Sequence, residues 1–224
     1  MTKFLIKLLF VALLLATGTA RADLFFRANL TNDQEPPIGS IPPQNPPSSG
    51  VAFFVLNDAR TSLSYFLDTT GLDFSRIDPA TGISNPLPVG DPARNDDALR
   101  IHIHQQVAGQ NGGIVFGMVE SSLQPNFQNT LNDPDDLVVN IANGIISGAW
   151  DGNEGNGTTL TAQLPFLFTQ GLYINVHTSD FAGGEIRGQI FQVFVPEPGS
   201  LALVACALGA IYLVVRRKAV KARA

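Results

Sequence analysis

Short runs in which apolar and polar residues alternate follow one another along most of the chain. Such alternation is typical of β-strands, and these runs are rich in aromatic and β-branched residues. None shows helical periodicity over a useful length. The runs predict strands within Asp23–Leu30, Val51–Asn57, Ser62–Thr69, Ala98–Gln105, Gly113–Glu120, Leu137–Trp150 (broken near Asn143–Gly144), Gly171–Thr178 and Gly184–Val195.

The segments between these runs have the composition of loops. Residues 34–49 carry six prolines and Arg76–Asp97 carries four, so both are predicted to be loops. Seven to nine strands at this spacing favour an antiparallel sandwich or a Greek-key barrel. Most of the phenylalanines, including Phe53 and Phe54, are expected in its core.

The first 22 residues have the three-part plan of a secretory signal peptide. Lys3 and Lys7 give a basic start, an apolar run follows, and Ala20–Ala22 fits a small-x-small cleavage site. The apolar run is too short to span a bilayer of ~30 Å. We expect residues 1–22 to be a signal helix that is removed, so that the mature chain begins near Asp23.

The C-terminal end combines an apolar run with a basic tail. Leu201–Val215 is uninterrupted and is followed by five lysines and arginines. A basic cluster after an apolar helix stays on the cytoplasmic side. Because a permanent span usually needs about 20 residues, we expect residues 201–215 to form a transmembrane helix that holds the chain in the inner membrane briefly.

Just before this run stand Pro196, Glu197 and Pro198. Together with the apolar run and the basic end, residues 195–224 resemble a PEP-CTERM sorting signal. The resemblance implies a bacterial protein that is processed by an exosortase-type enzyme, which removes the tail. The protein would then be exported through the inner membrane to the cell surface or the extracellular space. The alternative is an ordinary tail anchor with a chance Pro-Glu-Pro.

Charge and cysteine content limit the partners of the exported domain, residues 23–194. Between Asp23 and Glu197 the chain has 19 acidic residues, six arginines and no lysine, a net charge of −13. Such a charge repels nucleic acid, so nucleic acid is excluded as a partner. Cys206 is the single cysteine and lies in the apolar tail, so the domain lacks disulfides and thiolate ligands.

Three of the expected strands place unusual polar residues on one face, because side chains alternate along a strand. If these strands are neighbours, the three histidines of the chain converge with Glu185 and Arg187. The glycine-rich turn Ala182–Gly184 favours pairing of the last two strands. Strand by strand, the polar residues are Arg100, His102 and His104; Tyr173, Asn175 and His177; and Glu185, Arg187 and Gln189.

The pieces "RIHIHQ", "GGIVFGMVE", "LYINVHT" and "GGEIRGQI" together resemble the CHRD domain, named for repeats in chordin, over roughly Leu24–Val193. The chain departs from the family pattern where Gln105 and Gln106 follow His104. The resemblance implies an immunoglobulin-like or superoxide-dismutase-like fold. We therefore predict an all-β, antiparallel Greek-key sandwich between a signal helix and a transmembrane helix. The role of the family is largely undefined.

The polar face has two interpretations. In the first, which we favour, Arg100, Asn175, Arg187 and Gln189 join the histidines in a structural polar cluster. In the second, His102, His104 and His177 bind Zn²⁺ or Cu²⁺, and Glu185 is a fourth ligand or orients a histidine. Calcium is a weaker hypothesis, in the loops "DPDD" and "DGNEGNG".

No catalytic motif is compelling in this sequence. It lacks a Gly-x-Ser-x-Gly elbow, and the adjacent carboxylates Asp96–Asp97 and Asp135–Asp136 are expected to be solvated loop charge. The sequence favours a structural or binding module at the cell surface or in the extracellular matrix rather than an enzyme. Its partner would be an extracellular polysaccharide or a matrix protein. The alternative is a metal-binding domain, or a metal-dependent enzyme, that uses the three histidines.

Overall fold

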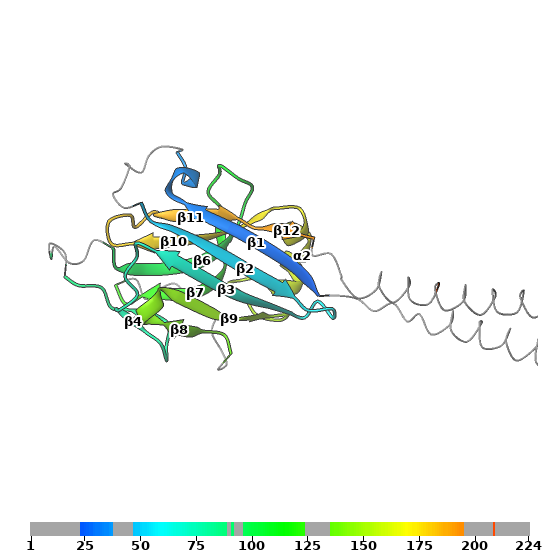
Figure 1. The fold of residues 1–224 in the computed structure, drawn as a ribbon, viewed down its shortest axis with the longest axis horizontal. Coiled ribbons are helices and arrows are strands. Elements are labelled where there is room, and N and C mark those ends of the chain that lie inside the picture. Colours follow the sequence, from blue (N-terminus) through cyan, green and yellow to red (C-terminus); the bar gives the residue numbers. More distant parts are fainter. Residues whose placement is uncertain are drawn as a thin grey trace, which may run out of the picture. The chain divides into compact units, whose positions relative to one another are not determined.

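The computed structural model describes residues 23–37, 47–88, 91, 96–123, 135–194 and 208 (Figure 1). The elements are β1 (Leu24–Thr31), η1 (Asn32–Gln34), β2 (Ser49–Leu56), β3 (Ser62–Thr70), β4 (Ile77–Asp78), β5 (Ile83–Ser84), β6 (Ala98–Gln105), β7 (Gly113–Ser121), β8 (Val138–Asn140), η2 (Ile141–Asn143), β9 (Ile145–Asp151), α2 (Leu160–Phe168), β10 (Leu172–Thr178), β11 (Ile186–Gln189) and β12 (Phe191–Val193).

The predicted signal helix, residues 1–22, and the sorting motif, residues 196–198, lie outside the described residues. So does the predicted transmembrane helix, residues 201–215, except for Leu208. Within the described ranges, no helix combines the length and the apolar character that a membrane crossing needs. The chain divides into a compact unit that ends at Val193 and a second unit, Phe194–Ala224. The strands named above all belong to the first unit.

These strands form one hydrogen-bonded sheet in the order β4-β5-β7-β6-β10-β11-β1-β2-β3-β9-β8. Neighbouring strands are antiparallel, except that β5 runs parallel to β7. β1 pairs with β11 near its C-terminal end and with β12 near its N-terminal end. The all-β class is therefore confirmed, and β6, β10 and β11 are neighbours.

The sheet curls on itself so that its two halves enclose the core. Trp150 of β9 stacks on Phe116 of β7 with ring centroids 4.9 Å apart, although these strands lie far apart in the sheet order. Tyr65 of β3 meets Phe116 edge-on at 6.2 Å. Figure 1 shows β1, β2 and β3 side by side in front of β6 and β10. The result is sandwich-like but nearly closed, like a barrel, and the predicted Greek-key order is not confirmed.

The alternation of apolar and polar residues along β3 explains why one face of this strand packs on the core and the other faces solvent. Leu63, Tyr65 and Leu67 are buried, and the residues between them are exposed. On β2, Phe54 is buried, but Phe53 is 47% exposed, so its predicted place in the core is wrong. Period-two geometry places two adjacent aromatic residues on opposite faces, and one of them must leave the core.

The helix α2 was not expected from the sequence. Thr159 caps its first turn by accepting a hydrogen bond from the Ala162 N–H at 3.2 Å. Leu160 and Leu167 are buried in the core. Pro165 inside the helix explains the omission, because proline within a helix removes a hydrogen bond and usually argues against helical structure.

Two other predictions need correction. The expected loop Arg76–Asp97 contains β4 and β5, two-residue strands that extend one edge of the sheet. The expected strand Gly184–Val195 is divided at Ile190 into β11 and β12. The predicted break near Gly144 is present: η2 and Gly144, which has a φ of +64°, separate β8 from β9.

Candidate metal centre

The pairing of β6 with β10 brings the three histidines together. His102 lies opposite Asn175 and His104 opposite Tyr173, while His177 lies opposite Arg100. All of these side chains therefore share one face of the sheet. The three imidazole centroids are 5.4 to 5.9 Å apart. One ligand nitrogen from each histidine lies within 4.8 Å of the other two.

The pairing of β6 with β7 is irregular at the same point. The register shifts between Ile101 and His102, and again between Ile103 and His104. His102 lies opposite Gly117, which has no side chain to fill the space beside the imidazole. Bulges of this kind re-aim side chains and are common next to functional sites. The sequence pattern alone does not reveal them.

This polar face is buried rather than solvent-exposed. His102 is 0% exposed, and His104 and His177 are 7% exposed. Two loops fold over it, and hydrogen bonds hold both. Arg187 donates to the Gln110 carbonyl at 2.9 Å, and Arg100 donates to the Ala182 carbonyl at 2.6 Å. The loops bury a polar face that alternation alone would leave at the surface.

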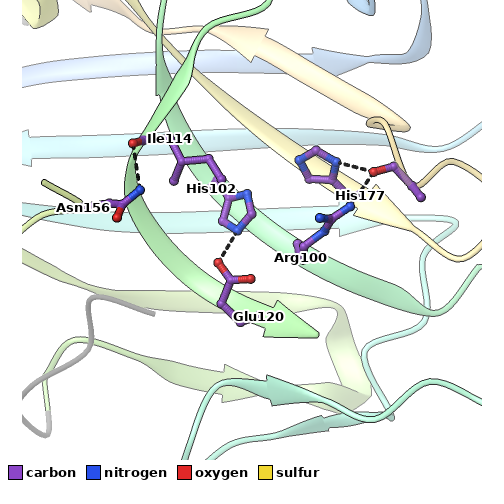
Figure 2. A network of polar contacts seen from close by, with 7 residues as sticks. Arg100, His102, Ile114, Glu120, Asn156 and His177 are labelled. Atoms are coloured by element: carbon purple, nitrogen blue, oxygen red, sulfur yellow. Dashed lines mark hydrogen bonds and ion pairs between the residues drawn. The ribbon is translucent and has the colours of Figure 1, made fainter. Parts of the chain in front are cut away.

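Each histidine has one ring nitrogen held by an oxygen. The Nδ1–H of His104 donates to the Gly112 carbonyl at 3.0 Å, and the Nδ1–H of His177 donates to the Ala182 carbonyl at 3.1 Å. The Nε2–H of His102 donates to Glu120 Oε1 at 2.6 Å. Figure 2 shows His102 directed at Glu120. These acceptors fix the tautomers, since a neutral imidazole has one N–H and one lone pair.

The lone pairs are then on Nε2 of His104 and His177 and on Nδ1 of His102. Within the described residues, the buried Nε2 atoms of His104 and His177 make no hydrogen bond. An imidazole whose one nitrogen donates to a carbonyl or carboxylate, so that the other nitrogen carries the lone pair, is the usual arrangement of a histidine that ligates a metal.

Two of the histidines, His104 and His177, are neutral at neutral pH. The pKa of His104 is lowered from 6.5 to about 4, mainly by burial and also by His102, Arg187 and Arg100, while the hydrogen bond to Gly112 raises it. Burial likewise lowers the pKa of His177 well below its ordinary value. Neutral imidazole is the form that offers a lone pair to a metal.

Glu120 is the functional residue that sequence reasoning missed. It lies near the end of β7, is 2% exposed, and accepts the hydrogen bond from His102. Its sequence signal is a carboxylate at the end of an otherwise apolar run, "GIVFGMVE". The sheet order gives this carboxylate its partner, because β7 lies beside β6, the strand that carries His102. Pairing order cannot be derived from alternation within one strand.

In the part of the chain that the structure describes, Glu185, the expected fourth ligand, is not among the residues whose ligand atoms converge with the histidines. Its carboxylate accepts a hydrogen bond from the Thr178 hydroxyl. Burial raises its pKa, against hydrogen bonds from Ser48 and Thr178. Through these contacts Glu185 supports the end of the β10–β11 hairpin.

The remaining polar residues form the structural part of the cluster. Arg187 is 2% exposed and lies 3.6 Å from the ring centroid of Tyr173, which in turn stacks on His104 at 4.9 Å. Gln189 donates to the carbonyls of Gln106 and Leu172. These contacts hold the covering loops and orient His104. They do not explain why its Nε2 lone pair is buried.

The expected calcium loop "DGNEGNG" is arranged differently. Glu154 is buried, and its carboxylate accepts the backbone N–H of Asp151 at 2.8 Å. Its backbone carbonyl accepts the indole N–H of Trp150 at 2.8 Å. In the described ranges, this loop is not among the groups whose ligand atoms converge. Its carboxylate stabilises a turn.

The model of the CHRD domain family matches residues 26–190. No curated protein matches the chain. The matched residues begin in β1 and end at Ile190, after β11, and they include all three histidines and Glu120. Because the match covers most of the chain, the chain belongs to the CHRD domain family.

Proposed function

We propose that this member of the CHRD domain family is a secreted binding module whose ligand is a divalent transition-metal ion, Zn²⁺ or Cu²⁺. His102, His104 and His177 would be the ligands. The observation that carries the proposal is the set of three buried imidazoles, each hydrogen-bonded through one nitrogen, with one ligand nitrogen of each within 4.8 Å of the others.

A purely structural cluster accounts for less of this geometry. It explains the hydrogen bonds to Gly112, Ala182 and Glu120. It does not explain two buried Nε2 atoms that have no hydrogen bond within the described residues, since an unsatisfied buried acceptor costs about 1–3 kcal/mol. A metal ion would use both lone pairs at once.

The donor set selects the class of metal. Neutral imidazole suits Zn²⁺ and Cu²⁺, whereas Ca²⁺ and Mg²⁺ prefer oxygen. Glu120 would increase the basicity of His102 and fix its ring, as carboxylates do for metal-bound histidines. Three protein ligands leave room for water or a small ligand at a fourth position.

The location of the protein belongs to the same proposal. CHRD membership is consistent with an extracellular or secreted protein. We infer that residues 1–22 direct export and that residues 195–224, with Pro196, Glu197 and Pro198, are the sorting signal for an exosortase-type enzyme. Residues 201–215 would hold the chain in the inner membrane until cleavage. The exported domain would then act at the cell surface, beside polysaccharide or matrix protein.

Titration of the purified, metal-free chain with Zn²⁺ and Cu²⁺ tests the metal proposal. Because the chain has three histidines, all at this site, a tag without histidine is essential. One equivalent of metal should bind to the native chain and to Glu185→Gln, which removes the carboxylate that lies outside the group. Equal uptake by His104→Gln, or no stoichiometric uptake by the native chain, would refute the proposal.

A further inference from the structure

A second convergence of ligand atoms lies where the turn after β3 meets the start of β6. Asp73 and Asp97 form an isolated parallel bridge. The Asp73 N–H donates to the Asp96 carbonyl, and the Ala98 N–H donates to the Asp73 carbonyl, both at 2.8 Å. This backbone pairing brings three carboxylates together, and one oxygen from each of Asp73, Asp96 and Asp97 lies within 4.8 Å of the others.

Asp97 distinguishes this group from a solvated acidic loop. Its side chain is 0% exposed, so the expectation that Asp96–Asp97 is simply solvated charge is wrong for Asp97. Its Oδ2 accepts the Leu87 N–H at 2.9 Å. Its Oδ1 is buried and makes no hydrogen bond within the described part of the chain. A buried carboxylate oxygen without a donor is costly unless a cation meets it.

The charges around Asp97 favour a cation over a neutral partner. The carboxylates of Asp73 and Asp96 are like charges close to Asp97, and Arg76 is an opposite charge near it. Asp180 also contributes negative charge at this end of the unit, because it and Asp96 raise the pKa of Glu185. Arg76 is thus one positive charge among several carboxylates.

We propose that Asp73, Asp96 and Asp97 bind a Ca²⁺ ion that ties the turn after β3 to the start of β6. Carboxylate oxygens are the ligands that hard cations prefer. Ca²⁺ accepts six to eight oxygens in flexible geometry and can draw on carbonyls and water, whereas Mg²⁺ demands a near-ideal octahedron. The site differs from the histidine centre in ligand type, and either site can fail without the other.

Isothermal titration of the EDTA-treated full chain with Ca²⁺, and with Mg²⁺ for comparison, tests this proposal. Extracellular calcium modules bind with a Kd of roughly 10⁻⁴–10⁻³ M, and a similar value is expected here. At about ten times the Kd, Ca²⁺ should raise Tm by about 4 °C. No binding heat and no Tm shift at 10 mM Ca²⁺, about ten times the weakest such Kd, would overturn the proposal.

Variants locate the ion. Asp96→Asn and Asp97→Asn should lose the Ca²⁺-dependent Tm shift, and His104→Gln should keep it. Asp58→Asn is the matched control, because Asp58 is an exposed carboxylate on the turn after β2. Asp96 is also exposed, so Asp96→Asn decides the matter if Asp97→Asn fails to fold. Ca²⁺ binding that survives in Asp96→Asn would place the ion elsewhere and refute the assignment.

Discussion

Two faces of the same sheet show opposite relations between polarity and burial. On β6 and β10, the face that carries His102, His104 and His177 is buried. On β2 and β3, the outer face carries Phe53 and Phe66, which are 47% and 40% exposed and lie opposite each other. Alternation identifies which side chains share a face. Whether that face meets water depends on the loops that cover it.

The loops explain the difference physically. Above β6 and β10, the carbonyls of Gln110, Gly112 and Ala182 supply acceptors for arginine and histidine, so polar groups can be buried without losing their hydrogen bonds. The Phe53 face has a cation–π contact instead: Arg27 lies 5.6 Å from the ring centroid of Phe53. Buried polar groups are the more informative observation, whereas scattered exposed apolar groups are ordinary.

The largest expected effect comes from removing one ligand from the buried face. His177→Gln should lower Zn²⁺ or Cu²⁺ affinity by more than about 100-fold, because two imidazoles cannot replace three in a site of this kind. Competition with a chromogenic chelator measures the change. A variant that binds as tightly as the native chain would show that the buried face is purely structural.

Acid should destabilise the metal-free chain through His104. Its pKa is about 4 in the folded chain and 6.5 when unfolded, so the unfolded state binds more protons between these values. The contribution is therefore present above pH 6.5 and is lost as pH falls through 4, by about 3 kcal/mol.

Urea unfolding of the native chain and of His104→Gln, from pH 4 to 7, isolates this contribution. The comparison is needed because burial raises the pKa of Glu35 to about 7, and stability from that group falls as pH rises. Glu35 contributes equally to the free energy of unfolding of both chains, so its contribution cancels in the difference between them. If the free energy of unfolding changed with pH in the same way in both chains, the burial of a neutral His104 would be contradicted.

Glu120→Gln should have an intermediate effect. The amide keeps the size of the side chain but removes the charge that orients His102, so metal affinity should fall by about 10- to 100-fold. Glu120 is a positioning residue. X-ray absorption of the metal-loaded variant should therefore still show three imidazole ligands. Glu120→Asp should restore part of the affinity. An unchanged Kd for the metal in Glu120→Gln would show that Glu120 does not position His102 for metal binding.

The exposed aromatic face should give the smallest effect. Phe53→Ser should cost less than about 1 kcal/mol, the range of a single cross-strand pair, and should leave metal uptake unchanged. Phe54→Ser, one position away and buried, is the matched comparison and should cost several times more. Equal destabilisation by the two substitutions would contradict the assignment of faces.

The strands were largely predictable, and the pairing that makes the site was less so. Period-two patterns place β3, β6 and β10 almost residue for residue, because one face of each strand has a distinct polarity, and β7 is recognised as a short apolar run. Sheet order depends on contacts between distant segments, so Glu120 could not be assigned to His102. The helix α2 was not predicted because Pro165 lies inside it. The burial of the histidines depends on hydrogen bonds to loops, and no periodic sequence pattern predicts such bonds.

X-ray absorption at the metal edge of the loaded native chain tests the central claim most directly. The account predicts one Zn²⁺ or Cu²⁺ per chain with three imidazole nitrogens at about 2.0–2.1 Å. A first shell that contains oxygen alone, or fewer than three imidazoles, would contradict a centre formed by His102, His104 and His177.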